Sequence, residues 1–494
     1  MNHLMTWVIA YLFATIAIGL WAARRVKNTA DFAIAGRHLP MYMIITTTFA
    51  TWFGSEIVLG VPAKFIGGGL HAVVEDPFGA GMCLILVGLF FAAKLYRMTL
   101  LTISDYYRTR YGRSIEIICS LIIMLSYLGW VSAQVTALGL VFNLLSGGAI
   151  GISMGMFIGV VSILAYTLFG GMWSVAVTDF IQMIILVVGL LVLAFFASDM
   201  AGGAARVIDL AVSRDLFKFW PEPTWHQMVF FFGAAITMML GSIPQQDVFQ
   251  RVMSANTEKS AVRGTVIGGS AYILFAFVPM FLVASALLIM PEQTASLLKD
   301  DPQKVLPTLV MERMPLLMQV LFFGALLSAI KSCASATLLA PSVTFTENIW
   351  RQFRPHISDR ENLLTMRISV LVFATCVLAY SIRMQGTPIY ELVSGAYQVP
   401  LVGAFVPLAF GLYWKRATTQ GALAAVLLGI GVWLSGLNMA WGAQFPAQLA
   451  GVLAAMAGMV AGSLLPQWVR NQHTPVEPFE PEEPRGGAGA APVQ

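Results

Sequence analysis

The sequence predicts an all-α polytopic membrane protein with about thirteen transmembrane helices, and three observations lead to this fold class. Of the 494 residues, 58% are hydrophobic and only 11% are charged, whereas soluble domains carry about 25% charged residues. The mean hydropathy is +0.77. The apolar residues form continuous runs of about 18–25 residues rather than alternating with polar ones, which favours helices over a β-barrel. A water-soluble globule of this size is therefore excluded.

Thirteen apolar runs are long enough to cross a bilayer. The first run has no basic segment before it and is followed directly by Arg24 and Arg25, so we interpret it as a membrane span rather than a cleaved signal. The runs lie near residues 5–23, 41–61, 74–93, 115–144, 149–169, 180–198, 226–244, 264–289, 317–345, 367–383, 389–413, 421–440 and 446–465.

The basic residues are divided unequally between the two sets of connecting segments. With the N-terminus placed outside, twenty of the 29 Lys and Arg residues fall in inside segments and eight fall in outside segments. Only Lys331 falls within a span. The positive-inside rule therefore predicts an external N-terminus and a cytoplasmic C-terminus in a bacterial-type cytoplasmic membrane. An odd number of spans agrees with that topology.

Cysteine, histidine and net charge exclude several functional classes. The four cysteines lie in apolar segments without CxxC spacing, and the six histidines are scattered, so neither a disulfide framework nor a metal or haem centre is indicated. We expect no enzyme, no organic cofactor and no obligate protein partner. The net charge of +4 is sorted by membrane side, which argues against a nucleic-acid partner. Residues 471–494 are rich in Pro, Glu, Gly and Ala and predict a disordered cytoplasmic tail rather than a signalling domain.

Two spans are interrupted by glycine, proline and polar residues. The second span carries the sequence ATWFGSE over residues 50–56 at its centre, and the seventh carries GSIP over residues 241–244 near its inner end. Transporters with inverted repeats place substrate and ion sites where helices are broken at the bilayer midplane. The alternative is that Gly and Pro are simply common in membrane helices. If spans two to six and seven to eleven form two repeats, both interruptions fall in the first helix of a repeat.

Glu56 is the sharpest single indication of a site. An acid inside a span costs roughly 2.5–3.5 kcal/mol even on a lenient insertion scale, so Glu56 must face a cavity, a partner or an ion. Glu75 and Asp76 follow at the start of the third span, where a solvated helix start with a proline in its first turn explains them equally well.

Four motifs resemble those of the sodium:solute symporter family. They are residues 31–40 (DFAIAGRHLP), 170–182 (GGMWSVAVTDFIQ), 250–255 (QRVMSA) and 411–418 (GLYWKRAT), in the family's order. The resemblance implies a leucine-transporter-like fold of two inverted five-helix repeats with broken first helices. It also implies cation-coupled symport, most often with Na⁺, of a small organic solute by alternating access.

The resemblance also divides the chain into segments with distinct expected roles. An extra N-terminal helix with a cytoplasmic loop comes first, and an external loop separates the two repeats. Two further helices and the tail follow the second repeat. The expected boundaries are 1–40 for the first segment, 41–198 for the first repeat, 199–225 for the external loop, 226–413 for the second repeat, 414–470 for the two C-terminal helices and 471–494 for the tail.

By the same resemblance, sodium lies between the second and ninth spans. Ligands spaced three residues apart share one face of a helix, and oxygen atoms suit a hard cation. Cys333 departs from the family, which has Ser or Thr there, and sulfur is a poor partner for a hard ion. Ser332 has the alternative of bonding a carbonyl one turn earlier in its own helix. The implied ligands are Ala50, Phe53, Ala329, Ser332 and Cys333.

Lys331 also departs from the family, which has an apolar residue at this position. Its side chain lies about 200° around the helix from Ala329, so it does not point straight into the ion site. We expect it to pair with Glu56 or Asp76, to face the cytoplasmic cavity or to replace a coupling ion; a snorkelling structural lysine is the alternative. Together with Cys333, it motivates the alternative function of proton coupling or uniport.

The solute site is implied by the same alignment to lie on the second, third and eleventh spans. An aromatic wall and unpaired carboxylates would favour a cationic or zwitterionic solute. Asp179 falls where the family has an acid on the ion's exit path, and a plain helix N-cap explains it equally well. A transporter-like sensor is a further alternative, against which the short tail argues. The implied solute residues are Trp52, Ser55, Glu56, Asp76 and Tyr390.

Overall fold

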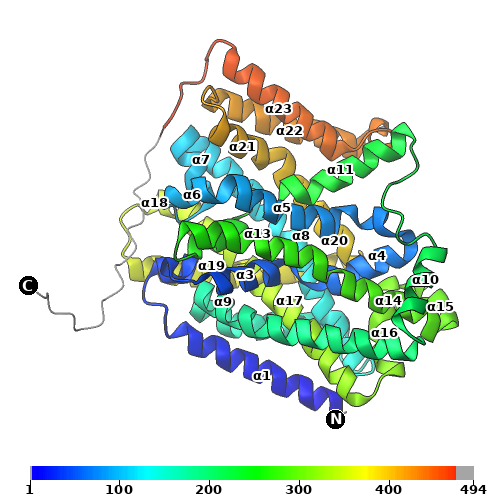
Figure 1. Ribbon diagram of the computed structural model, residues 1–494. Coiled ribbons are helices and arrows are strands. Elements are labelled where there is room, and N and C mark those ends of the chain that lie inside the picture. Colours follow the sequence, from blue (N-terminus) through cyan, green and yellow to red (C-terminus); the bar gives the residue numbers. More distant parts are fainter. Residues whose placement is uncertain (1–2, 474–494) are drawn as a thin grey trace, which may run out of the picture.

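The computed structural model describes residues 3–473, and within that range the chain is folded into helices without a β-strand. The predicted fold class is therefore confirmed (Figure 1). The predicted tail lies almost wholly outside the described residues. The helices are α1 (His3–Ala23), α2 (Thr29–Ile34), α3 (Met41–Trp52), α4 (Val61–Gly68), α5 (Ala80–Leu86), α6 (Ala92–Arg97), α7 (Ile103–Tyr111), α8 (Arg113–Leu145), α9 (Ile152–Met200), α10 (Ala204–Ser213), α11 (Trp225–Gly241), α12 (Gln246–Ser254), α13 (Glu258–Phe275), α14 (Phe277–Ile289), α15 (Pro291–Asp300), α16 (Val305–Arg313), α17 (Leu316–Thr344), α18 (Arg351–Phe353), α19 (Asp359–Arg383), α20 (Ile389–Pro400), α21 (Val406–Tyr413), α22 (Thr419–Asn438) and α23 (Ala447–Leu464).

The number of membrane-crossing helices agrees with the sequence. Among the described residues, ten helices are long and apolar enough to span a membrane, and two bent helix pairs raise this to twelve. Helix α9 has 49 residues and breaks at Gly171, where φ is 45°. At about 1.5 Å per residue it is more than twice the roughly 30 Å thickness of a bilayer core, so it covers two of the expected spans. The count is consistent with thirteen.

Both predicted interruptions are real breaks. Helix α3 ends at Trp52, and a second helical segment begins at Glu56. The two segments are bent by 56° relative to each other. A Cβ atom on Gly54 would lie 2.7 Å from the Glu56 carboxylate and 2.8 Å from the Gln134 side-chain oxygen, so only glycine fits where these groups approach. Helices α11 and α12 meet at 46° around Pro244, which has no N–H to continue the helical hydrogen bonding.

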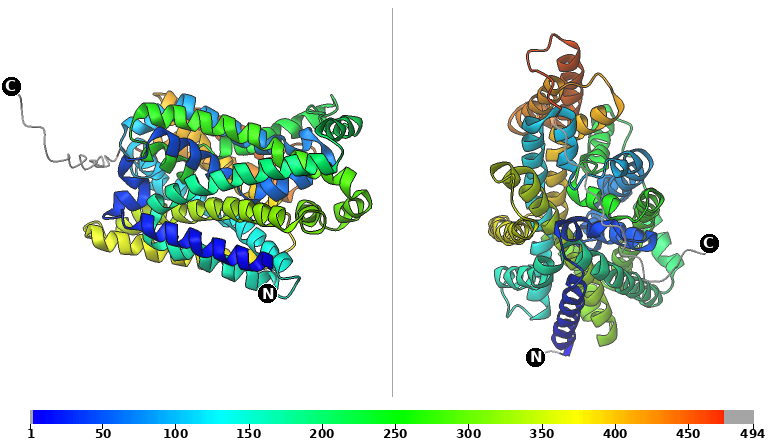
Figure 2. Two further views of the ribbon diagram at one scale, coloured as in Figure 1. Left: turned by 60° about the horizontal axis from the view of Figure 1, so that its bottom comes forward. Right: turned by 90° about the vertical axis from the view of Figure 1, so that its left-hand side faces the viewer.

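The long helices lie side by side in one bundle, with α1 at one side and the α22–α23 pair at the opposite side (Figures 1 and 2). Helix α17 is the centre of the packing, because it contacts α1, α3, α8, α9 and α19. It is also the most buried candidate span after Ile389–Tyr413, with 67% of its apolar window inside the protein. Side chains of α17 can therefore take part in several sites at once.

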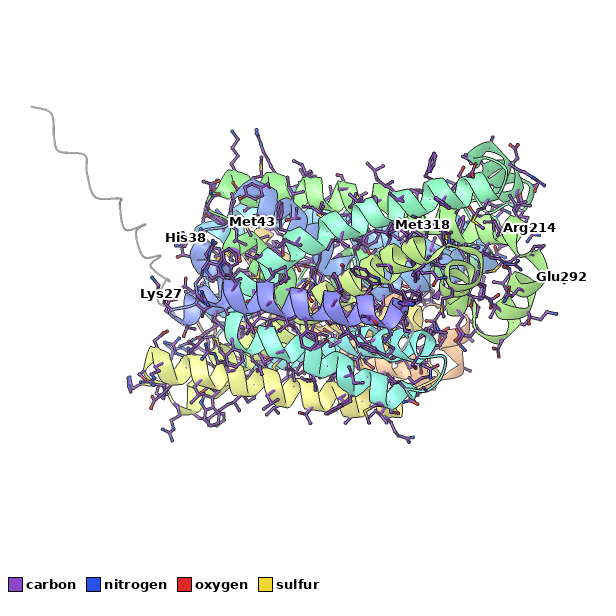
Figure 3. All side chains as sticks on the ribbon, turned by 90° about the horizontal axis from the view of Figure 1, so that it is seen from below. Lys27, His38, Met43, Arg214, Glu292 and Met318 are labelled. Carbon is purple, nitrogen blue, oxygen red and sulfur yellow. The ribbon has the colours of Figure 1, made fainter. Side chains whose placement is uncertain are left out.

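The two ends of the bundle carry the segments that the charge distribution assigns to opposite membrane sides. Lys27 and His38 lie at one end, and Arg214 and Glu292 lie at the other (Figure 3). Large apolar side chains such as Phe195 are exposed on the flanks between them, as a lipid-facing surface requires. The structure thus agrees with a transmembrane arrangement, and the assignment of each end to a membrane side stays a prediction.

Candidate functional site

The break after α3 places Glu56 in the interior of the bundle. Its carboxylate accepts a hydrogen bond of 2.6 Å from Nε2 of Gln134 and one of 3.3 Å from the indole Nε1 of Trp130. The side-chain oxygen of Gln134 in turn accepts the backbone N–H of Ser55 at 2.9 Å. All four side chains are buried. The sequence identified Ser55 and Glu56, but it gave no local signal for their two partners on α8.

A second buried carboxylate comes from the other broken helix. Asp247 of α12 accepts the indole N–H of Trp52 at 2.9 Å and the hydroxyl of Tyr127 at 2.5 Å. Arg251, one turn further along α12, donates to the backbone oxygen of Asp247 at 3.0 Å. Asp247 was missed by the sequence reasoning, although an acid three residues after Pro244 in an interrupted span was a usable signal.

The two tryptophans that bind these carboxylates belong to one aromatic cluster. The ring centroids of Trp52 and Trp130 are 6.1 Å apart, and that of Tyr397 lies 6.2 Å from the first and 5.1 Å from the second. Tyr127 stacks on Trp130 at 6.0 Å. We call these four rings the aromatic cluster. Aromatic faces beside carboxylates attract cations, because the negative face of each ring adds to the field of the acids.

An oxygen-rich cluster lies where α17 passes the end of α3. Oγ of Ser332 lies 3.1 Å from the carbonyl oxygen of Ala50 and 2.5 Å from Oδ1 of Asp179. The second carboxylate oxygen of Asp179 accepts a bond of 2.6 Å from the hydroxyl of Thr47. We call these four residues the oxygen cluster. Carbonyl, hydroxyl and carboxylate oxygens with one net negative charge are the donors that suit a hard monovalent cation.

The structure brings together only part of the expected ion ligands. Ala50 and Ser332 meet as implied, and Asp179 joins them from α9. Cys333 instead places its sulfur 4.0 Å from the carboxylate of Glu56. Phe53 follows the end of α3 with non-helical backbone angles, φ −80° and ψ 65°, so its carbonyl is released from the helical pattern. Ala329 lies inside α17, and the role of its carbonyl as an ion ligand stays a prediction.

Lys331 is not paired with Glu56 or Asp76, so that expectation is wrong for the described structure. Nζ of Lys331 donates to Oγ1 of Thr15 on α1 at 2.7 Å and lies 5.4 Å from the ring centroid of Tyr166. Asp76 accepts the hydroxyl of Tyr272 instead, at 2.6 Å. The reason is helical geometry: at about 100° per residue, Lys331 projects from the face of α17 that α1 covers.

This position predicts how Lys331 contributes to stability. Replacing a buried charged group by an apolar side chain of similar volume is often neutral or stabilising, whereas removing its partner strands the charge. We therefore expect Lys331→Met to leave the melting temperature and the sodium activation curve nearly unchanged. Thr15→Val should destabilise the protein by about 1–3 kcal/mol. Thermal melting followed by fluorescence-detected gel filtration checks the stability of both variants, and sodium-dependent uptake into proteoliposomes checks the activation curve. A strong loss of sodium activation in Lys331→Met would contradict this placement.

The remaining expected solute residues lie apart from the aromatic cluster. Tyr390 begins α20 and lines two cavities together with Lys64, whose Nζ is 5.3 Å from the tyrosine ring centroid. Asp76 interacts electrostatically with Glu56 on one side and with Glu75 on the other. The expected solute site is therefore divided into a central group around Glu56 and a second group around Tyr390.

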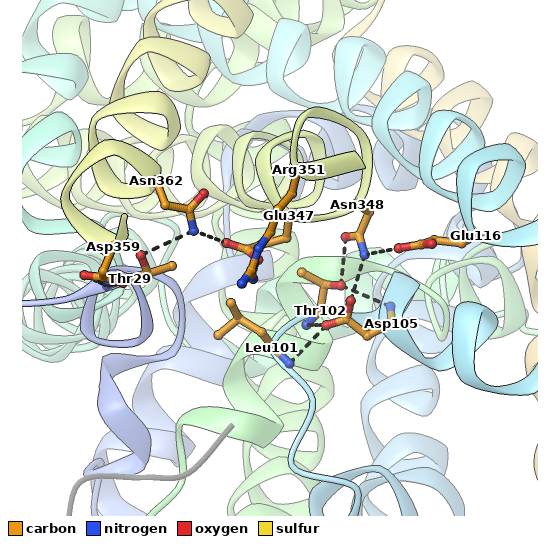
Figure 4. Close-up of polar contacts among 10 residues, drawn as sticks. All are labelled: Thr29, Leu101, Thr102, Asp105, Glu116, Glu347, Asn348, Arg351, Asp359 and Asn362. Carbon is orange, nitrogen blue, oxygen red and sulfur yellow. Dashed lines mark hydrogen bonds and ion pairs between the residues drawn. The ribbon is translucent and has the colours of Figure 1, made fainter. Parts of the chain in front are cut away.

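A further buried polar cluster, which the sequence did not reveal, joins the ends of α7, α8 and α17 (Figure 4). The amide of Asn348 donates to Asp105 at 2.8 Å and to Glu116 at 2.9 Å, and its oxygen accepts the hydroxyl of Thr102 at 2.8 Å. One amide thus satisfies two buried carboxylates from two different helices. Its neighbour Glu347 accepts a bond of 2.5 Å from Asn362 of α19.

Removing this amide should weaken the fold at that end of the bundle. We expect Asn348→Leu to destabilise the protein by about 1–3 kcal/mol, because both carboxylates lose a buried donor. Gln352→Leu is the matched control, because the amide of Gln352 donates mainly to the backbone oxygen of Asn348, at 2.5 Å, and reaches the Glu116 carboxylate only at 3.5 Å. Thermal melting in detergent compares the two variants. Equal melting temperatures for Asn348→Leu and the parent would contradict the role assigned to the amide.

The fold and the site together define a class of protein. Two helices broken within the membrane, with buried carboxylates and an oxygen cluster at the breaks, are the features of secondary transporters that bind solute and ion at the midplane. The model of the sodium:solute symporter family matches residues 32–429, and the chain belongs to this family.

Comparison with individual proteins gives the same result. The chain is 26% identical over 451 residues to the high-affinity choline transporter 1 of Caenorhabditis elegans, covering 86% of this chain and 76% of that protein. It is 27% identical over 446 residues to the human high affinity choline transporter 1, covering 87% and 76%. It is 24% identical over 467 residues to the sodium/glucose cotransporter 4 of Danio rerio, covering 86% and 70%.

Solved structures show the same fold at lower sequence identity. The substrate-bound, outward-open Na⁺-coupled sialic acid symporter aligns with a TM-score of 0.82 at 19% identity, covering 94% of this chain and 97% of that one. Mhp1, a nucleobase-cation-symport-1 family transporter, aligns with a TM-score of 0.61 at 15% identity, covering 88% and 95%.

The chain is thus a polytopic membrane protein and a secondary active, sodium-coupled symporter of a small solute. Its family and relatives are transporters rather than enzymes.

Proposed function

We propose that the solute is a small organic cation of the quaternary-ammonium type, bound between Glu56 and the aromatic cluster. The observation that carries the proposal is the environment of Glu56. This carboxylate is 1% exposed, and its hydrogen-bond donors are the neutral side chains of Gln134 and Trp130. The ion pairs found among residues 3–473 do not include Glu56. A buried charge without a counter-ion is costly, and an organic cation is the ligand that compensates it.

The aromatic cluster supports this solute class over a sugar. A quaternary ammonium group cannot donate a conventional hydrogen bond, so its recognition relies on ring faces and on net negative charge. Both are present here, since the indole N–H groups of Trp52 and Trp130 bind Asp247 and Glu56, which places the aromatic rings beside two buried carboxylates. The names of two relatives, which are choline transporters, support the same class.

The sodium site that we propose is the oxygen cluster, completed by the backbone carbonyls of Phe53 and Ala329. Ser332 and Cys333 are consecutive residues of α17, and the first contacts the oxygen cluster while the second contacts Glu56. A movement of the turn of α17 that carries these two residues therefore acts on both sites. This gives a physical route for the coupling of ion and solute binding.

We also propose which membrane holds the chain and on which sides its termini lie. The chain is placed in the cytoplasmic membrane with its N-terminus outside and its C-terminus inside, because twenty of its 29 basic residues then face the cytoplasm. Labelling of a single engineered cysteine near position 470 by an impermeant reagent tests this orientation. Labelling by this reagent when it is added outside intact cells would contradict a cytoplasmic C-terminus.

Uptake into proteoliposomes tests the solute class. Labelled choline, glucose and a neutral amino acid are supplied one at a time, with and without an inward sodium gradient at a clamped membrane potential. We expect choline to accumulate only with the sodium gradient. Sodium-driven accumulation of glucose or of the amino acid, without accumulation of choline, would overturn the proposal.

A further inference from the structure

A second candidate site for a cation lies outside the aromatic cluster, in an external cavity of about 570 Å³. The cavity is large enough for a solute of the size of choline. Its walls come from α4, from the turn that precedes α5, and from α11 and α20. The residues that matter below are Lys64, Glu75, Phe231, Tyr390 and Ser394, all of which line it.

Glu75 supplies a buried and incompletely used charge to this cavity. One of its carboxylate oxygens accepts the hydroxyl of Ser394 at 2.9 Å. The other, Oε1, is buried and has no hydrogen-bond partner among the described residues, and the whole side chain is only 5% exposed. An acceptor left without a partner in the wall of a cavity is a binding group for a positively charged ligand.

The ring of Tyr390 supplies the second binding group, and a cation of the protein already lies near it. Nζ of Lys64 is 5.3 Å from the ring centroid, which is a cation–π distance. Lys64 and Glu75 line the same cavity. Lys64 therefore lies where an incoming organic cation would lie, beside this ring and in the cavity that this acid lines.

Lys64 also borders a second cavity that is lined by acidic residues. It lines a neighbouring external cavity of about 500 Å³, whose wall includes Asp300 and Asp301, while Glu391 lines both cavities. Its side chain is exposed and flexible, so it can leave the ring of Tyr390 without losing an acidic environment. The cost of displacing it is therefore small compared with that of a buried, fixed ion pair.

The acids continue inward from this cavity. Asp76 follows Glu75 in sequence, is 1% exposed, and interacts electrostatically with Glu75 and with Glu56. One oxygen of Asp76 is bound by Tyr272, and the other has no partner among the described residues. Glu75 lines the cavity and Asp76 is the next residue along the chain, so a second buried carboxylate follows directly behind the cavity wall.

We propose that the external cavity is a second binding site for small organic cations, formed by Glu75 and Tyr390, and that Lys64 is a built-in competitor for it. The site receives the cation before it passes Asp76 and reaches Glu56. The proposal rests on the proposed cationic solute, but it concerns different residues and predicts an effect of the opposite sign: loss of the Lys64 charge should improve binding.

The test is equilibrium binding of labelled choline and tetramethylammonium to the full chain in nanodiscs, in a Trp52→Leu background that weakens the central site. We expect one weak site to remain. Lys64→Met should tighten this site by roughly 3–30-fold, which is the range of one cation–π interaction, and Glu75→Gln should weaken it by a similar factor. Lys64→Arg keeps a cation over the ring and should leave the affinity close to that of the background.

Lys304→Met is the matched control, because Lys304 lines the neighbouring cavity and pairs with Asp301 instead. Where Trp52→Leu does not fold, Glu56→Gln serves as the background. No remaining site, or an affinity that Lys64→Met leaves unchanged or weakens, would overturn the proposal while the central site of the parent still binds choline. Failure of the proposed function looks different: the parent then neither binds choline centrally nor imports it, and tetramethylammonium binding to the two Lys64 variants still decides on the external site.

Discussion

Neutralising Glu56 is expected to have the largest effect of any single substitution in this protein. Glu56→Gln removes the buried negative charge that compensates the solute, so uptake at low choline concentration should fall by about 10²–10³-fold, in line with the roughly 3–5 kcal/mol lost when a buried ion pair is broken. Sodium activation of the residual uptake should keep its midpoint. Initial-rate uptake into proteoliposomes measures both quantities.

Two controls separate this effect from a general loss of structure. Glu56→Asp keeps the charge and should retain more uptake than Glu56→Gln. Glu312→Gln alters an exposed carboxylate that contacts Gln293, and it should leave uptake unchanged. Uptake by Glu56→Gln at the parent rate would show that the solute is not held by this carboxylate.

The second large effect is expected at the oxygen cluster. Ser332→Ala removes the hydroxyl that joins Ala50 to Asp179, so the sodium concentration for half-maximal uptake should rise roughly 5–150-fold, the range of one lost oxygen ligand and of a typical coupling energy. Uptake at saturating sodium should be affected far less. The measurement is the sodium dependence of initial choline uptake.

The control for this experiment lies on the same helix. Ser342→Ala removes a hydroxyl that bonds only the carbonyl of Leu338 one turn earlier, and it should leave the sodium dependence unchanged. A sodium activation curve in Ser332→Ala that coincides with that of the parent would refute the assignment of this cluster to the ion.

The two helix breaks, and the acid at the first of them, could be predicted because their signals are local. Glycine, proline and an acid inside an apolar run each violate the pattern of an ordinary membrane helix, and they marked residues 50–56 and 241–244. The meeting of Ala50 with Ser332 followed from the resemblance to the family. Each of these features depends on residues close together in the chain or on a motif.

The partners across helices could not be predicted in the same way. Trp130 and Gln134 lie on α8, whose apolar sequence contains nothing unusual at those positions. The angle of Lys331 around α17 predicted that it would point away from the ion site, but not that α1 covers that face and offers Thr15. Which helix covers which face is a tertiary property, and a single sequence does not reveal it.

The central claim is that one protein binds sodium and an organic cation in sites that communicate through α17. Thermodynamic linkage requires that sodium tighten choline binding by the same factor by which choline tightens sodium binding. The direct measurement is choline affinity of the purified protein, by scintillation proximity, across a sodium series at constant ionic strength. We expect an affinity that rises with sodium in the parent and rises much less in Ser332→Ala. Choline affinity independent of sodium in the parent would contradict it.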